Sequence, residues 1–177
     1  MLAYGKETFA LWIILVSVWN FGSALDLGFG LSIVKFTSKY KNDNNKLSEI
    51  LGTSLTFLII WGLLLFFGIF LIGQFIYFTN TNLVSVENYT LSKTVFFILG
   101  VNFYISYLTV FFRATFEGLS HFIIIAKINL LTSIILAILT FVVYVKKLSL
   151  YYLAGASFFA STTNLTFSIF FFTKNFP

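Results

Sequence analysis

Five long apolar runs constrain this chain more than any other feature of its sequence. The runs cover residues 9–29, 51–78, 95–112, 122–145 and 148–172. A helix needs roughly 20 apolar residues to cross a bilayer, whereas a strand of a membrane barrel has about 10 residues of alternating polarity. The runs are longer than barrel strands and do not alternate. The sequence therefore predicts an all-α polytopic membrane protein with about five transmembrane helices.

The composition agrees with a membrane protein and excludes several kinds of site. Hydrophobic residues make up 59% of the chain and charged residues 10%, compared with about 25% charged residues in soluble domains. The chain has no cysteine and a single histidine, His121, so we expect no metal site and no cofactor. It also lacks a phosphate-binding loop of the Gly-Lys-Ser/Thr type, a GxSxG elbow and paired intramembrane carboxylates, so we do not expect an enzyme.

The lysines between the apolar runs predict the orientation in the membrane. Residues 35–49 contain Lys35, Lys39, Lys41 and Lys46, whereas residues 79–92 contain no lysine. Because short cytoplasmic loops are enriched in Lys and Arg, residues 35–49 are expected on the cytoplasmic side, together with residues 113–121. The net charge of +5 lies beside the membrane, which favours contact with anionic lipid over nucleic acid.

Polar side chains recur at helical spacing along four of the apolar runs. A spacing of three or four residues places them on one face of each helix. The stripes are Asn102, Ser106, Thr109, Arg113 and Glu117; Asn129, Thr132, Ser133 and Thr140; Ser157, Ser161, Asn164 and Ser168; and, if the first helix is continuous, Ser17, Asn20, Ala24, Gly28, Ser32, Lys35 and Lys39. Membrane helices also pack through small and hydroxyl residues, so the stripes indicate either dry helix contacts or a water-filled cavity.

Basic residues at the ends of two stripes favour the cavity. A guanidinium offers a planar fork that matches phosphate oxygens, and lysines add positive charge, so such a cavity would take an anionic ligand. We predict Arg113, Lys35 and Lys39 as substrate-binding residues. The predicted cavity lining is Asn20, Asn102, Ser106, Thr109, Asn129 and Asn164. The spacing of Arg113, Glu117 and His121 also permits a simple ion pair at a helix end.

Asp26 interrupts the first apolar run. A carboxylate at the bilayer centre costs roughly 2.5–3.5 kcal/mol, so Asp26 is near an interface, paired, or facing a polar interior. On an ideal helix it lies about 180° from the first stripe. Either the helix bends at Gly28 and Gly30, or Asp26 faces another neighbour; Asp26 could also be the N-cap of a new helix over residues 27–41.

Two patches resemble bacterial polysaccharide-export flippases of the O-antigen type, within the multidrug/oligosaccharidyl-lipid/polysaccharide superfamily. The first is GKETFALW at residues 5–12, followed by DLGFG at residues 26–30 and a basic helix. The second is FRATFEGL at residues 112–119, which is similar to a Leu-Glu-Gly turn between the family's fourth and fifth helices. We predict structural or pairing roles for Asp26, Gly28, Gly30, Glu117 and Gly118.

The resemblance implies transport of an undecaprenyl-pyrophosphate-linked oligosaccharide across the bacterial cytoplasmic (inner) membrane, for surface polysaccharide such as the O-antigen of lipopolysaccharide. Such transporters have two lobes that rock around a central site. Residues 1–177 would be a single partial lobe, helices two to six of the N-terminal one, that needs a second lobe or a homo-oligomer. The alternatives are a multidrug cation antiporter of the same superfamily, and a non-transporting membrane scaffold or truncated product.

Overall fold

The computed structural model describes residues 6–24, 28–79 and 86–175, with the side chains of residues 12–21, 28–74 and 93–174. Within these ranges the chain is helical and contains no strand. The helices are α1 (Lys6–Ala24), α2 (Phe29–Tyr40), α3 (Asn44–Thr79), α4 (Val86–Gly118), α5 (Phe122–Val145) and α6 (Leu150–Asn175). The predicted all-α membrane fold is confirmed.

The first apolar run does not form one continuous helix. α1 ends at Ala24 and α2 begins at Phe29, with Gly28 as its N-cap at φ 75°. This left-handed conformation favours glycine because a Cβ atom would be strained there. The chain breaks at Gly28, as one of the predicted alternatives had it, while Gly30 lies inside α2. The continuous stripe from Ser17 to Lys39 is therefore wrong. Gly28 holds the N-cap position predicted for Asp26, and Asp26 itself lies outside the described residues.

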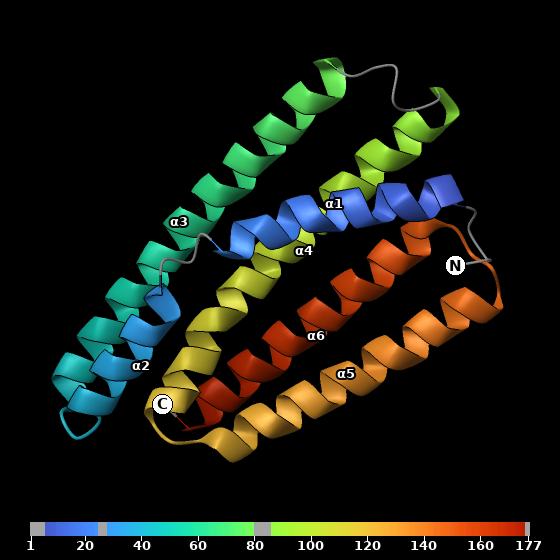
Figure 1. Ribbon diagram of the computed structural model, residues 1–177. Coiled ribbons are helices and arrows are strands. Elements are labelled where there is room, and N and C mark those ends of the chain that lie inside the picture. Colours follow the sequence, from blue (N-terminus) through green and yellow to red (C-terminus); the bar gives the residue numbers. More distant parts are fainter. Residues whose placement is uncertain (1–5, 25–27, 80–85, 176–177) are drawn as a thin grey trace.

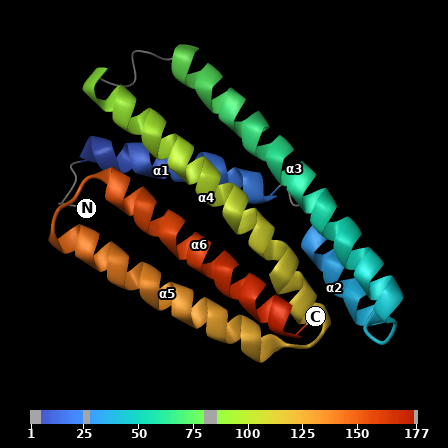
Figure 2. The same cartoon turned by 180° about the vertical axis from the view of Figure 1, so that it is seen from behind.

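α4 is the central helix of the bundle and contacts each of the other five described helices. Figures 1 and 2 show α3 beside α4 on one side and the hairpin of α5 and α6 on the other, while α1 crosses α4. The turn between α2 and α3, the turn between α4 and α5, and the end of α6 lie at one end of the molecule. The turn between α5 and α6 lies at the opposite end (Figure 1). This arrangement matches the alternation expected for helices that cross a membrane.

Aromatic packing joins α1, α3 and α4. The indole ring of Trp19 is 4% exposed and lies 5.0 Å from Phe96, 5.6 Å from Phe103 and 5.9 Å from Phe66, measured between ring centroids. Trp19 can come this close because α4 has a glycine beneath it: a Cβ atom on Gly100 would lie 2.6 Å from the indole. Such ring pairs contribute about 0.5–1.5 kcal/mol beyond the area they bury, so this junction holds α1 against α4.

Three described helices, α3, α4 and α5, are long and apolar enough to cross a membrane. Their outward side chains are apolar and exposed, for example Leu71 at 66% and Phe141 at 67%, as a surface covered by hydrocarbon requires. α6 occupies the predicted run 148–172 but falls short of that apolar content. The reason is its row of Ser, Thr and Asn residues, which faces the other helices as described below.

Candidate functional site

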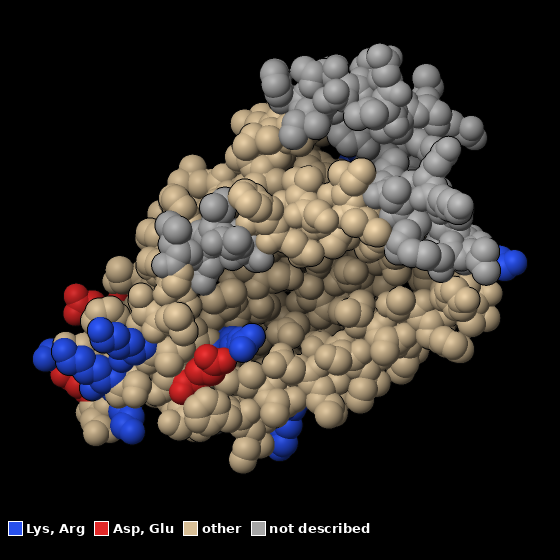
Figure 3. Space-filling model, viewed as in Figure 1, with Lys and Arg blue, Asp and Glu red and all other residues tan. Residues whose placement is uncertain are grey.

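The polar faces of α4, α5 and α6 meet in one groove. A cavity of about 330 Å³ lies between the three helices. Its lining is mostly hydroxyl and amide side chains: Asn102, Ser106 and Thr109 from α4; Thr132, Ser133 and Leu136 from α5; and Ser157, Ala160, Ser161 and Asn164 from α6. Three of the four predicted stripes therefore share this groove. Figure 3 shows that the hollowed middle of this face carries few charged side chains, which gather mainly where α2 meets α3.

A second cavity continues the groove toward the end of α4. It has a volume of about 160 Å³ and shares Thr109 and Asn164 with the first cavity. Its other lining residues are Arg113, Phe116, Ile125, Ile128, Asn129 and Ser168. Arg113 follows Thr109 by one helical turn, so the groove leads from neutral hydroxyl groups to a single positive charge.

Hydrogen bonds between the groove side chains cross from helix to helix. Ser106 Oγ lies 3.1 Å from Ser161 Oγ, and Asn164 Nδ2 donates to Thr132 Oγ1 at 3.4 Å. Ser168 Oγ donates to the other side of the Asn164 amide at 3.4 Å. The first bond links α4 to α6 and the second links α6 to α5, while the third lies within α6. Bonds between membrane helices of this kind average below about 1 kcal/mol, so they can exchange with water or a ligand at low cost.

Asn102 has an unsatisfied acceptor in the groove wall. Its Oδ1 atom is buried and accepts no hydrogen bond within the described part of the chain, although Asn102 lines the larger cavity. Leaving a buried acceptor unpaired costs about 1–3 kcal/mol. The Asn102 Oδ1 atom is closed off from water-sized molecules, so it does not itself contact the cavity, and other atoms of Asn102 form the cavity wall.

Arg113 and Glu117 form an ion pair at the end of the groove. Arg113 Nε donates to Glu117 Oε1 at 2.8 Å, and the two side chains are 67% and 29% exposed. An exposed pair four residues apart contributes only about 0.3–0.5 kcal/mol to stability. The bond uses the Nε edge of the guanidinium, which leaves the two terminal nitrogens to face an anion.

The other predicted site residues lie apart from this groove. Lys35 and Lys39 are exposed on α2, Asn20 is exposed on α1, and none of the three lines either cavity. The break at Gly28 places Lys35 and Lys39 on a different helix from Asn20, so the three residues do not form the single stripe predicted for one continuous helix. Gly118 has a packing role, because a Cβ atom there would lie 2.7 Å from Thr37 Cβ on α2. Gly30 lies within α2, near its start.

The site prediction missed the apolar members of the groove. Leu136 and Ala160 line the larger cavity, and Ile125, Ile128 and Phe116 line the smaller one. The same spacing would have found two of them, since Leu136 follows Thr132 by four residues and Ala160 follows Ser157 by three. A search restricted to polar residues could not include them.

Comparison with known proteins agrees with the helical, membrane-spanning character of the chain. No curated protein and no solved structure matches it. One family model, described as polysaccharide biosynthesis protein, matches residues 5–177, nearly the whole chain. The membrane helices, the two patches at residues 5–30 and 112–119 and this match lead to the same conclusion: the chain belongs to the polysaccharide biosynthesis protein family.

Proposed function

We propose that this chain forms one wall of a pathway that translocates an undecaprenyl-pyrophosphate-linked oligosaccharide from the cytoplasmic to the outer leaflet of the bacterial inner membrane. The observation that carries the proposal is the convergence of three polar helix faces on one groove that ends at Arg113. Hydroxyl and amide groups both donate and accept hydrogen bonds, which suits them to the hydroxyl groups of a sugar. The lipid tail would remain in the hydrocarbon outside the helices.

Arg113 is the proposed contact for the pyrophosphate. It is the only charged residue in the lining of the two cavities, both of which are built from described residues. Its terminal nitrogens can bind two phosphate oxygens at once. A multidrug cation antiporter would instead need an acidic group that can meet a cation in the groove. The lining contains no carboxylate, and Glu117, at the end of the groove, is bonded to Arg113. The chemistry of the lining therefore favours an anionic, sugar-bearing substrate and transport without covalent catalysis.

The proposal includes an orientation and a second wall. The end of the molecule that carries Lys35, Lys39, Lys41 and Lys46 would face the cytoplasm, as the distribution of lysines in the loops predicts. The groove would then open near Arg113 on the side from which the substrate comes. A second lobe or a second copy of the chain would close the groove, because alternating access requires two bodies that move around the site.

The test uses cells whose surface polysaccharide depends on this protein. Arg113→Glu should reduce export by roughly 10- to 100-fold, since a hydrogen bond to a charged group contributes about 1.5–3 kcal/mol. Arg113→Lys should retain part of the export because the positive charge remains but the two-pronged contact is lost. Lys127→Glu is the matched control, since Lys127 is exposed on α5 and lines neither cavity. Normal export by Arg113→Glu, at equal membrane abundance, would reject the role of Arg113.

A further inference from the structure

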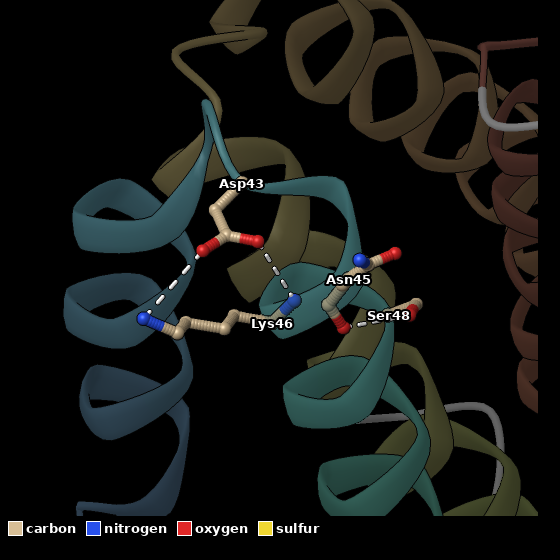
Figure 4. Close-up of polar contacts among 4 residues, drawn as sticks. All are labelled: Asp43, Asn45, Lys46 and Ser48. Atoms are coloured by element: carbon tan, nitrogen blue, oxygen red, sulfur yellow. Dashed lines mark hydrogen bonds and ion pairs between the residues drawn. The ribbon is translucent and has the colours of Figure 1, made fainter.

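The hairpin of α2 and the first turns of α3 carries exposed lysines on either side of a hydrogen-bonded turn. Asp43 caps α3, since its Oδ1 atom accepts from the Lys46 backbone N–H at 3.2 Å. Its Oδ2 atom lies 3.6 Å from Lys46 Nζ. Figure 4 shows both contacts around the turn. The cap fixes where α3 begins, and the Asp43 backbone N–H donates to the Tyr40 carbonyl oxygen at 2.9 Å, which ties this turn to the end of α2.

Two of these lysines gather around one aromatic ring. Lys39 Nζ lies 5.1 Å from the centroid of the Tyr40 ring, and Lys46 Nζ lies 5.5 Å from it. Cations within about 6 Å of an aromatic face are attracted to it. Both ammonium groups are therefore attracted to the same ring, and positive charge is concentrated around Tyr40. This concentration of positive charge favours an anion nearby.

Positive charge exceeds negative charge in this hairpin. Residues 35–49 carry the positive side chains Lys35, Lys39, Lys41 and Lys46 against Asp43 and Glu49, all of them in the described part of the chain. The carboxylate of Asp43 is already engaged by Lys46 and by the cap of α3. The hairpin thus keeps a net charge of +2, and Figure 3 shows basic side chains gathered at the end where α2 meets α3.

Exposed apolar side chains on α2 lie beside these lysines. Leu31 is 75% exposed and Phe36 is 44% exposed, and both are on the same short helix as Lys35 and Lys39. A helix with apolar side chains next to lysines suits the boundary of a bilayer, where the apolar groups enter the acyl region and the ammonium groups reach the phosphates. α3 has 36 residues, or about 54 Å at 1.5 Å per residue, so it extends well beyond a hydrocarbon layer of about 30 Å.

We propose that this hairpin is a docking site for the headgroups of anionic phospholipids. Lys39 and Lys46, held at the Tyr40 ring, bind the lipid phosphate, and Lys35 and Lys41 add positive charge. Leu31 and Phe36 contact the acyl chains. The exposed apolar side chains favour a lipid over a soluble phosphate, which would leave them in water. This site is separate from the groove and does not depend on the proposed transport function.

The experiment measures binding of fluorescent phosphatidylglycerol and phosphatidylcholine to the purified chain in mixed micelles. The wild-type protein should prefer phosphatidylglycerol, and the preference should weaken as salt is added. Lys39→Gln/Lys46→Gln should lower the affinity for phosphatidylglycerol by roughly 10- to 30-fold, because each lysine near an anionic surface contributes substantially to attraction. Lys39→Arg/Lys46→Arg should keep the preference.

The control is the pair Lys146→Gln/Lys147→Gln, which removes the same charge at the turn between α5 and α6. Equal losses in both Gln pairs would show a general charge effect and overturn the site. Competition by inorganic phosphate at millimolar concentration would show a soluble-anion site instead of a lipid site. If the Lys39→Gln/Lys46→Gln protein showed no thermal unfolding transition, the folded Lys39→Arg/Lys46→Arg protein would be used in its place. Failure of that folded protein to bind phosphatidylglycerol would reject the proposal.

Discussion

Gly118→Ala is predicted to loosen the contact between α2 and α4. A Cβ atom at Gly118 would lie 2.7 Å from Thr37 Cβ, 2.9 Å from the Val34 carbonyl oxygen and 3.0 Å from Thr37 Cγ2. Favourable contacts between carbon atoms lie at about 3.5–4.0 Å, so α2 must move away by roughly 1 Å. Thr37 is fully buried, and because the nearest atom is its Cβ, no change of side-chain rotamer would relieve the contact.

The loss of stability expected for Gly118→Ala can be measured against the same substitution at a second glycine, Gly155. Overpacking of this kind costs about 1–3 kcal/mol, while replacing a helical glycine by alanine gains up to about 1 kcal/mol. Gly155→Ala in α6 is the matched control, because its Cβ atom would meet nothing within 4 Å. Gly118 is the last residue of α4 and Gly155 lies inside α6, so the difference between the variants is mainly the steric cost. Gly118→Ala should therefore unfold at a temperature about 2–12 °C below that of Gly155→Ala.

Intrinsic tryptophan fluorescence of the purified protein in detergent gives both unfolding temperatures. The double variant Gly118→Ala/Thr37→Gly should show a favourable coupling relative to the sum of the single variants, because it removes two of the three close contacts. Equal unfolding temperatures for Gly118→Ala and Gly155→Ala would refute the reasoning and would mean that α2 does not press on the end of α4 as the structure shows.

Two further predictions concern water and orientation. Ser133 lines the larger cavity, whereas the adjacent Ile134 is 49% exposed on α5 but lies outside that lining. If the groove holds water, a cysteine at Ser133 should react with a charged thiol reagent faster than a cysteine at Ile134. Equal rates would indicate dry helix packing in the groove. If the lysine-rich hairpin is cytoplasmic, a cysteine at Asn45 should be protected from an impermeant maleimide in intact cells, while a cysteine at Ser149 should be labelled. The reverse labelling pattern would show that the orientation is the opposite of the predicted one.

The sequence predicts the groove well because helices are regular. Asn102, Ser106 and Thr109 share a face by spacing alone, and the same holds for Ser157, Ser161 and Asn164. Spacing also shows that each face needs a polar neighbour in an apolar bilayer. It does not show which helices pair, and that information came from the arrangement of α5 and α6 against α4.

The same regularity misleads where the backbone breaks. The stripe through Asn20, Lys35 and Lys39 assumed one helix, but Gly28 adopts a left-handed conformation and α2 starts anew at Phe29. A break of this kind changes the direction of every later side chain. Gly28 and Gly30 indicate in the sequence that a bend is possible at this point, but a glycine pair permits a bend without requiring one.

The two sides of α4 have different mechanical character. Toward α1 and α3, large rings interlock, and neither helix can slide along α4 without moving Trp19, Phe96 and Phe103 out of their contacts. Toward the middle of α6, α4 presents Ser106, whose hydrogen bond to Ser161 can be exchanged for one to water. α4 packs less extensively against α5 than against α6. The helices α1, α3 and α4 therefore form a rigid unit, and we expect any widening of the groove to be a displacement of α5 relative to that unit.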